Sequence, residues 1–336
     1  MSFTETTLLS FCSTRTKRMI KSTNWKVPRL YFTITEKYIS VHLCHDDWLN
    51  ALSLMVLYVD QFMENSEVSK LRNSSLELRF MKLGFTRENR IPVEYYGKSY
   101  DVIQVLNEFL DDSRHELYKH FIALFPNTPK IQLNTEAGTD LRLVPISKYV
   151  RDLKLSGLEA DVDYAEEYFS KCKNLQRAVV EPVLKGEVKE NSKITSVKRL
   201  LCLNTELQTR SLIFKFNGQV ATFQNCRCNV NVIIDVLKLW ISNEAFQNVE
   251  RLSMIRMYCS WDNIPWWTED VVLQAIESSP SDPSKRPDNC GKKYEVVSWI
   301  IKPLKCADYR DITRKTDGKR ASFHVDASSF RFVVWN

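Results

Sequence analysis

The chain has 336 residues, of which 44% are hydrophobic and 26% charged, as is common for a globular protein of about two domains. This apolar content excludes a wholly disordered chain, and only eight glycines exclude collagen-like sequence and argue against large glycine-rich nucleotide loops. The 47 basic and 41 acidic residues give a formal net charge of +6. So mild an excess is compatible with nucleic-acid binding but does not indicate it.

The sequence shows neither a secretion signal nor a membrane-spanning run. Near the N-terminus the basic residues follow the apolar ones, the reverse of a signal peptide. The longest apolar runs, such as Ala51–Val59, fall well short of the ~20 residues that a bilayer requires. The nine cysteines are odd in number and irregularly spaced, which favours free thiols in a reducing compartment. We therefore expect a protein of the cytoplasm or the nucleus.

Motifs for catalysis and metal binding are lacking in the sequence. Neither Gly-x-Gly-x-x-Gly nor Gly-x-Ser-x-Gly occurs. His115 and His120 are five residues apart, so they lie about 140° apart around a helix and favour a surface helix over a shared metal ion. His42, Cys44 and His45 could ligate zinc, but no second ligand pair follows at a suitable spacing. We expect no enzyme activity, no cofactor and no metal.

Strands and helices are both predicted in the first half of the chain. A helix is expected at Leu8–Asn24, where apolar residues gather near one face and Pro28 follows. Apolar and polar residues alternate in Arg29–Thr35 and Tyr38–Leu43, which predicts two strands that pair with each other. The other elements predicted here are helices at Trp48–Met63 and Val102–Phe125 and strands at Leu76–Phe80 and Lys130–Leu133.

From Arg151 onward the chain alternates between strand-like and helix-like segments. Asn217-Gly218, between two alternating runs, predicts a β-hairpin, with a strand-to-loop turn as the alternative. The predicted strands are Leu153–Leu155, Arg177–Val183, Ser196–Leu203, Ser211–Phe216, Val220–Phe223 and Val249–Tyr258. The predicted helices are Val162–Cys172, Val232–Ser242, capped by Asn231, and Glu269–Ile276, capped by Thr268.

Four more strand-like segments close the chain, at Tyr294–Ile301, Tyr309–Lys315, Arg320–Val325 and Phe330–Trp335. We expect them to form a terminal antiparallel sheet. The fold class is therefore predicted to be α/β (α+β): a short N-terminal helix, then an irregular strand–helix stack like that of leucine-rich repeats, then the closing sheet.

Two groups of residues are candidate binding sites. The first is the N-terminal helix, whose basic residues include Arg15 and Lys17; it offers a surface for an acidic partner, or it is a solvated face with a basic last turn that suits the helix dipole. The second is the cluster Trp261, Trp266 and Trp267. Three tryptophans in seven residues either anchor a partner or fill the end of the core.

The run from Leu9 to Ile20, Leu-Ser-Phe-Cys-Ser-Thr-Arg-Thr-Lys-Arg-Met-Ile, resembles the final helix of an F-box. Leu9, Phe11 and Cys12 occupy its apolar places, and Arg15 occupies the place of its arginine. The C-terminal half is similar to the associated domain, type 2, of the large nematode-type F-box family. The stretches that carry this similarity are Asn231–Trp240, Val249–Met257, Trp266–Ile276, Ile312–Ser322 and Phe330–Trp335.

This resemblance implies a non-catalytic substrate-recognition subunit of a Skp–cullin–F-box ubiquitin ligase, whose F-box docks on the Skp adaptor and whose associated domain holds a target protein. It divides the chain into a partial F-box-like helical segment (1–28), a strand and helix region (29–145) and an F-box-associated domain (146–336). The residues expected to contact partners are Leu9, Phe11, Cys12, Arg15, Lys17, Trp261, Trp266 and Trp267.

The F-box-like segment departs from the family pattern in one respect. No Leu-Pro occurs among the 20 residues before Lys21, so the first half of the docking motif has no counterpart. A stable interface buries about 1,200–2,000 Å² in total, and one helix supplies only part of that. We expect weak or absent adaptor binding. The alternative hypothesis is a nucleic-acid-binding or stand-alone protein-interaction module that uses the basic N-terminal helix.

Overall fold

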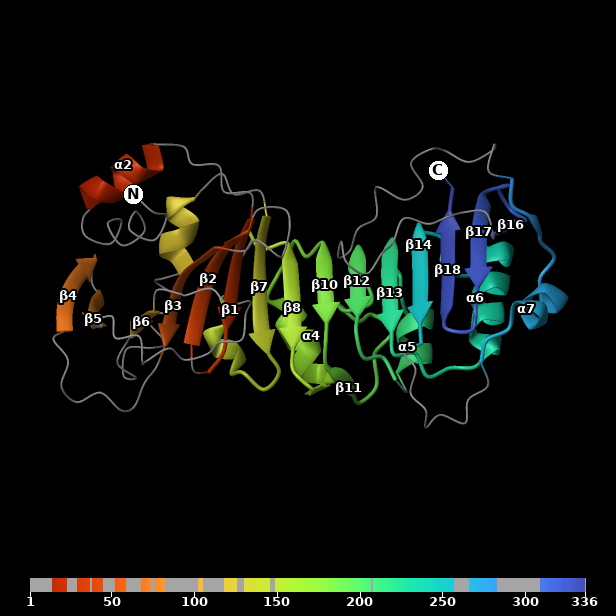
Figure 1. The fold of residues 1–336 in the computed structure, drawn as a ribbon, viewed down its shortest axis with the longest axis horizontal. Helices are drawn as coiled ribbons and strands as arrows, with labels where there is room; N and C mark the ends of the chain where they lie inside the picture. The colour runs from red at the N-terminus through yellow and green to blue at the C-terminus, as the bar shows by residue number, and fades with distance from the viewer. Residues whose placement is uncertain are drawn as a thin grey trace. The chain divides into compact units, whose positions relative to one another are not determined.

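A computed structural model shows a mixed α/β protein with extensive β-sheet and few helices (Figure 1). It describes residues 14–22, 29–36, 38–44, 52–58, 68–73, 76–81, 102–104, 118–125, 130–145, 149–206, 208–256, 266–282 and 309–335. The chain divides into two compact units, Met1–Arg151 (unit 1) and Asp152–Asn336 (unit 2), with the division close to the predicted boundary after Pro145.

Unit 1 contains a mixed sheet with the strand order β7–β1–β2–β3–β6 and a separate antiparallel pair, β4–β5. Strands β1 and β2 pair antiparallel, as predicted, with Phe32 opposite Val41. The elements of unit 1 are α2 (Thr14–Ser22), β1 (Arg29–Ile34), β2 (Tyr38–Cys44), β3 (Leu52–Tyr58), β4 (Val68–Asn73), β5 (Leu76–Met81), β6 (Val102–Gln104), β7 (Lys130–Glu136) and the 3-10 turn Leu141–Leu143.

The core of unit 1 forms between β1 and the helical residues 118–124. Phe32 is fully buried, and its ring lies 5.0 Å from that of Tyr118 and 6.3 Å from that of Phe121. Aromatic pairs at these separations stabilise a core beyond the area that they bury. The alternation that predicted β1 therefore reflects a strand with one face packed on a helix.

Two helix predictions in unit 1 need correction. The predicted helix Trp48–Met63 contains strand β3 instead, because a short apolar run such as Leu52–Tyr58 fits a buried strand as well as a helix. The predicted helix Val102–Phe125 begins as strand β6, while residues 118–124 are helical as predicted. Of the predicted N-terminal helix, Thr14–Ser22 is confirmed and the remainder lies outside the described residues.

Unit 2 contains a mixed sheet in which β8, β10, β12, β13 and β14 are parallel and follow in chain order (Figure 1). Antiparallel strands β18, β17, β16 and β15 continue it, which confirms the predicted antiparallel end. Strands β9 and β11 form a separate parallel pair. The strands of unit 2 are β8 (Asp152–Ser156), β9 (Glu159–Asp161), β10 (Arg177–Val180), β11 (Val183–Lys185), β12 (Arg199–Cys202), β13 (Val220–Gln224), β14 (Arg251–Ile255), β15 (Ser279–Pro280), β16 (Arg310–Thr313), β17 (Arg320–Val325) and β18 (Ser329–Val334).

One face of this sheet packs against helices that connect the parallel strands. Trp240 of α6 packs edge-on against Phe332, with ring centres 5.3 Å apart, and Phe216, just after α5, packs likewise against Phe223. Right-handed crossovers place successive helices on the same face. The helices of unit 2 are α4 (Val162–Ser170), α5 (Thr209–Phe214), α6 (Val230–Ser242) and α7 (Glu269–Ala275).

The segment before β13 differs from its prediction. The predicted strand Ser211–Phe216 contains helix α5 in place of a hairpin arm, because the adjacent residues Leu212 and Ile213 are both buried, which suits a helix better than a strand with one buried face. Gly218 lies in the turn into β13, and a Cβ there would approach the Val197 carbonyl oxygen to 2.0 Å. Asn-Gly at this site therefore serves a helix-to-strand turn.

Most other elements of unit 2 are predicted correctly to within a few residues. The cap of α6 is Asn229, two residues before the predicted one, and its side chain accepts a hydrogen bond from the Asn231 backbone N–H. Thr268 precedes α7 as predicted, but its side chain makes no capping hydrogen bond. The predicted strand Tyr294–Ile301 lies outside the described residues. Within the part of the chain that the structure describes, no helix is long and apolar enough to cross a bilayer.

Candidate functional site

The loops that follow the parallel strands of unit 2 are joined by side-chain hydrogen bonds. The Asn204 side-chain amide, after β12, donates to the Glu181 carbonyl oxygen, after β10, at 2.6 Å. The Asn225 amide, after β13, donates in turn to the Asn204 side-chain oxygen at 2.5 Å. These two hydrogen bonds hold the neighbouring loops in fixed positions. In open α/β proteins, ligands bind at this end of the parallel strands.

A second pair of side chains fixes the same loops from inside. The Thr205 hydroxyl donates to the Gln224 carbonyl oxygen at 2.9 Å, and the Cys226 thiol donates to the Phe223 carbonyl oxygen at 3.2 Å. Both residues are buried. The Gln224 carbonyl oxygen also accepts the Thr205 backbone N–H at 3.0 Å, so the Thr205 side chain adds a second hydrogen bond between the two loops.

Arg256 follows strand β14 and lies beside two tryptophans. Its guanidinium carbon is 4.9 Å from the ring centre of Trp266 and 5.6 Å from that of Trp267. Trp267 is only 1% exposed, and its indole N–H donates to the Cys228 carbonyl oxygen at 2.9 Å. Trp267 therefore belongs to the core, which corrects its assignment as a partner contact. Trp261 lies outside the described residues.

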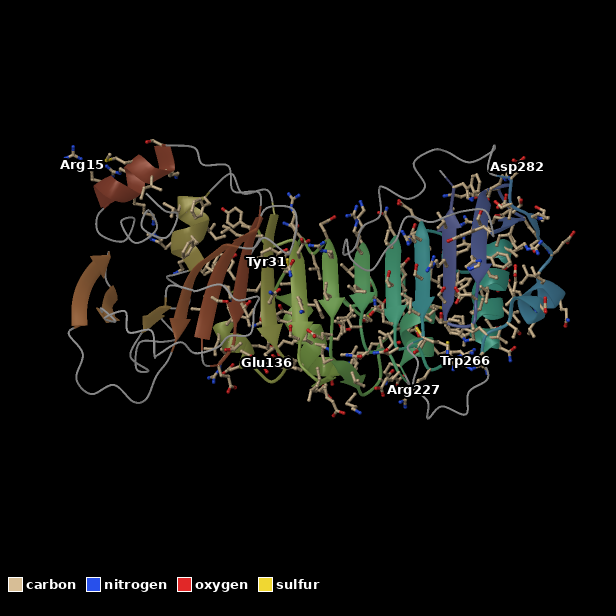
Figure 2. All side chains as sticks on the ribbon, in the orientation of Figure 1. Arg15, Tyr31, Glu136, Arg227, Trp266 and Asp282 are labelled. Carbon is tan, nitrogen blue, oxygen red and sulfur yellow. The ribbon has the colours of Figure 1, made fainter. Side chains whose placement is uncertain are left out.

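Trp266, in contrast, is 47% exposed and lies along the edge formed by the carboxyl ends of the parallel strands. Figure 2 shows Trp266 and Arg227 at this edge, both pointing outward. The positive charges of Arg210 and Arg256 both oppose the rise in the pKa of the Cys228 thiol that burial causes. We call Arg210, Arg227, Arg256 and Trp266 the Trp266 surface; its exposed members are two arginines and an indole ring.

The thiols of Cys226 and Cys228, near the Trp266 surface, have raised pKa values. Burial raises the pKa of the Cys226 thiol to about 11, and burial with the neighbouring Cys226 raises the pKa of Cys228. Cys226 and Cys228 are therefore protonated at neutral pH. A thiol must be deprotonated to act as a nucleophile or a metal ligand. Among the described residues, no group of three or more histidine, cysteine, aspartate or glutamate side chains could hold a metal ion.

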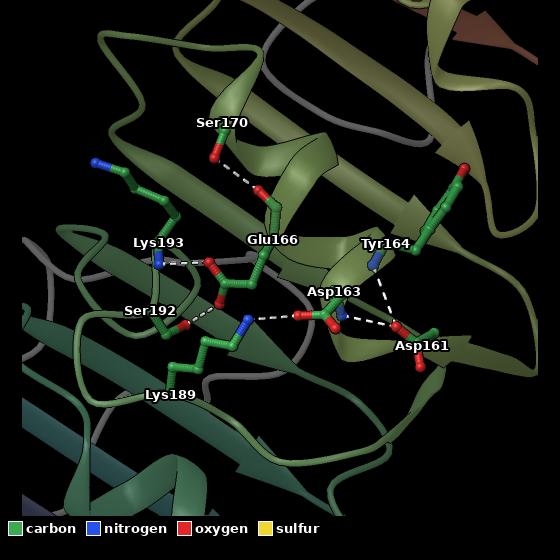
Figure 3. Close-up of polar contacts among 8 residues, drawn as sticks. All are labelled: Asp161, Asp163, Tyr164, Glu166, Ser170, Lys189, Ser192 and Lys193. Atoms are coloured by element: carbon green, nitrogen blue, oxygen red, sulfur yellow. Dashed lines mark hydrogen bonds and ion pairs between the residues drawn. The ribbon is translucent and has the colours of Figure 1, made fainter.

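A polar cluster joins helix α4 to the loop after β11 (Figure 3). The Glu166 carboxylate accepts from the Ser192 hydroxyl and, at 2.8 Å, from the Lys193 backbone N–H. Lys189 pairs with Asp163 at 2.6 Å, and both side chains are largely exposed. Ser192 is buried and its hydroxyl also accepts a backbone N–H within its own turn. The cluster anchors the loop, and its acids are already engaged by the loop itself.

The basic N-terminal helix is partly engaged within unit 1. Arg15 is exposed (Figure 2), but Lys17 is half-buried and its amine lies 3.1 Å from Nδ1 of His120. His120 is buried rather than on a surface helix, and burial, followed by the charge of Lys17, lowers its pKa to about 3. The other predicted contacts on this helix lie outside the described residues: Leu9, Phe11 and Cys12.

Sequence reasoning missed two features of these sites. Arg256 belongs to no sequence motif. It supports the Trp266 ring only because it follows β14 and lies beside Trp266 and Trp267. The Asn204–Asn225 contact joins residues 21 apart, and the recurrence of asparagine after successive strands was its only sequence signal. Comparison of the chain with protein-family models, curated proteins and solved structures finds no match.

Proposed function

We propose that the protein is a non-catalytic recognition subunit that binds a target protein through unit 2, like the substrate-recognition subunits of the Skp–cullin–F-box ligases that its sequence resembles. The observation that carries this proposal is the exposed Trp266 ring held on the buried Arg256 at a fixed edge of the sheet. Target binding, rather than a reaction, is the role that this edge suits.

The energetics of protein interfaces support this use of Trp266. Tryptophan and arginine are enriched among the few residues that dominate binding energies. The Trp266 ring is positioned before any partner arrives, because Arg256 is 7% exposed and stacks on it. Binding then loses less side-chain entropy than it would with a mobile ring. An arginine over an indole ring also contributes a cation–π attraction.

The repetition of unit 2 supports a leucine-rich-repeat-like scaffold. Its parallel strands begin at residues 152, 177, 199, 220 and 251, at intervals of 25, 22, 21 and 31; the first three fall within the 20–29 residues of a leucine-rich repeat and the last is longer. Thr205 and Cys226 each stand three residues after a buried strand residue, Cys202 and Phe223. Leucine-rich repeats place asparagine or cysteine at this position, which Cys226 matches and Thr205 does not. Such scaffolds commonly present binding surfaces to other macromolecules.

Adaptor binding by the N-terminal helix is a weaker part of the proposal. The amine of Lys17 already contacts His120, so this side chain is engaged within unit 1. We propose that unit 2 binds its target whether or not a Skp adaptor and cullin are recruited. A pull-down with purified Skp adaptor tests this, with weak or absent binding as the expected result and sub-micromolar affinity as the contrary one.

The second candidate function, nucleic-acid binding, is favoured by the exposed basic residues Arg15, Arg18 and Lys21 of α2. Phosphate contacts release counterions, so the logarithm of the affinity would fall linearly with the logarithm of the salt concentration. Filter binding of duplex DNA and RNA at several salt concentrations tests this function. Steep salt dependence that Arg15→Gln reduces would support it.

Replacement of the exposed tryptophan tests the main proposal. Trp266→Ala should abolish capture of the target, and Tyr149→Ala should not, since Tyr149 is a similarly exposed aromatic residue (53%) of unit 1. Both variants should melt close to the wild-type temperature. If Trp266→Ala retains full binding of every partner that the wild-type chain captures, the Trp266 surface is not the recognition site.

A further inference from the structure

A row of charged residues crosses the sheet of unit 2 on the face opposite the helices. The first residues of the five parallel strands align in register: Asp152, Arg177, Arg199, Val220 and Arg251. Their side chains alternate with the helix-facing residues that follow each of them, such as Leu200 and Leu252, so they share the opposite face. We call these five residues the arginine row.

Within this row Asp152 and Arg177 pair with each other, whereas Arg199 stands outside that pair. Arg177 forms an ion pair with Asp152 at 2.5 Å, and the side chains are 11% and 13% exposed. Arg199 stands directly opposite Arg177, on a strand about 4.8 Å away. Its half-buried side chain makes no hydrogen bond or ion pair with any described residue. Like charges directly opposite each other on adjacent strands destabilise a sheet, so this position favours an added anion.

The neighbouring row on the same face adds hydrogen-bond donors without an acid. Thr222 and Ser253 stand two residues beyond Val220 and Arg251 and lie opposite each other in register. They are 2% and 5% exposed, and their hydroxyls have no hydrogen-bond partner. A buried polar group without a partner costs free energy and calls for an explanation. Two hydroxyls and the Arg199 guanidinium group, on one face of the sheet, suit a ligand that is rich in acceptors.

We propose that the arginine row binds a carboxylate of an acidic segment in the target protein, with Arg199 as the contacting cation. This inference rests on the proposed function and names the chemistry of the partner. Charge complementarity selects an acidic peptide: Asp152 neutralises Arg177, and the carboxylate would neutralise Arg199. An arginine accepts a carboxylate through two parallel hydrogen bonds, so one aspartate or glutamate suffices.

Fluorescence anisotropy of a labelled ten-residue polyglutamate peptide with the full chain tests this inference. Arg199→Gln should weaken binding about 10-fold, since it removes a charge-assisted hydrogen-bonding group. Lys198→Gln is the matched control, because Lys198 is exposed and immediately precedes Arg199; it should stay within about twofold of wild type. The melting temperature of Arg199→Gln should not fall, because the substitution relieves the repulsion with Arg177.

Three results would overturn the inference: no binding of the peptide at millimolar concentration, equal losses in the two variants, or equal competition by inorganic phosphate or single-stranded DNA. The last would mark a site for any anion or for nucleic acid. Trp266→Ala should leave the binding of polyglutamate unchanged, since glutamate carries no aromatic ring or large apolar group that would pack on the Trp266 ring. Failure of the Trp266 surface alone is therefore distinguishable from failure of the arginine row.

Discussion

The guanidinium carbon of Arg256 lies beside two tryptophan rings, 4.9 Å from the centre of the exposed Trp266 ring and 5.6 Å from that of the buried Trp267 ring. The two rings are adjacent in sequence, yet one belongs to the surface and the other to the core. Arg256 follows β14 directly, so the sheet sets the position of the group that supports the exposed ring. A partner that contacts Trp266 therefore meets a surface anchored in the core.

Alanine substitutions should separate the two tryptophans by their effects on stability. Trp267→Ala removes a fully buried ring and its hydrogen bond to the Cys228 carbonyl, and should cost about 3–5 kcal/mol of unfolding free energy. Trp266→Ala should cost less than about 1 kcal/mol, as is usual for surface substitutions. Urea denaturation followed by circular dichroism measures both. Equal losses in the two variants would mean that Trp266 is also a core residue.

The Asp152–Arg177 ion pair should be costly to break from one side. Asp152→Ala leaves Arg177 largely buried beside Arg199 without its counter-charge, and should destabilise unit 2 by about 3 kcal/mol. The double variant Asp152→Ala/Arg177→Met removes both charges and should recover much of this loss. Thermal melts of the wild-type chain and of the single and double variants measure these losses of stability, as in a double-mutant cycle. Additive losses would show that the two side chains do not interact.

The buried thiols should resist alkylation in the native chain. Burial raises the pKa of Cys172 and of Cys226 to about 11, so at pH 8 both remain protonated and shielded from solvent. Iodoacetamide followed by peptide mass spectrometry should leave them unlabelled and should label both fully in 6 M guanidinium chloride. Rapid labelling of Cys226 in the folded chain at pH 8 would contradict its protonated, enclosed state.

His120 should make unit 1 sensitive to acid. Its folded pKa is lowered to about 3 from 6.5, first by burial and then by Lys17. Between these two values the unfolded chain binds a proton that the folded chain does not, so stability is fully present above pH 6.5 and falls as the pH drops toward 3. The loss approaches about 1.4 kcal/mol per pH unit. Urea titrations from pH 7 to pH 4 should show a shallower slope for His120→Gln; an unchanged slope would contradict the assignment.

The sequence predicted the periodic elements well and the contacts between distant residues poorly. Strand β1 and helix α6 were recognisable because apolar residues recur at the period of a strand or a helix. Strand β3 and helix α5 were mistaken because their apolar runs are short and fit either structure. The Trp266–Trp267 pair shows the same limit: both residues are tryptophan, and only the position of Arg256 and Cys228 decides which ring is buried.

The arginine row was beyond sequence reasoning for a related reason. In the sequence, 22 residues separate Arg177 from Arg199 and 52 separate Arg199 from Arg251. Only the register of the parallel strands brings the three onto one face. A net charge of +6 gave no indication of where the excess lies. Register depends on pairing between strands, which local periodicity does not contain.

Quantitative affinity purification from a lysate of the source organism tests the central claim most directly. Tagged wild-type chain, Trp266→Ala and Tyr149→Ala are compared by mass spectrometry of the bound proteins, with circular dichroism to confirm that each variant is folded. The account predicts a protein partner recovered with the wild-type chain and with Tyr149→Ala and lost with Trp266→Ala. A partner recovered equally by all three chains, or catalytic turnover by the isolated protein, would contradict it.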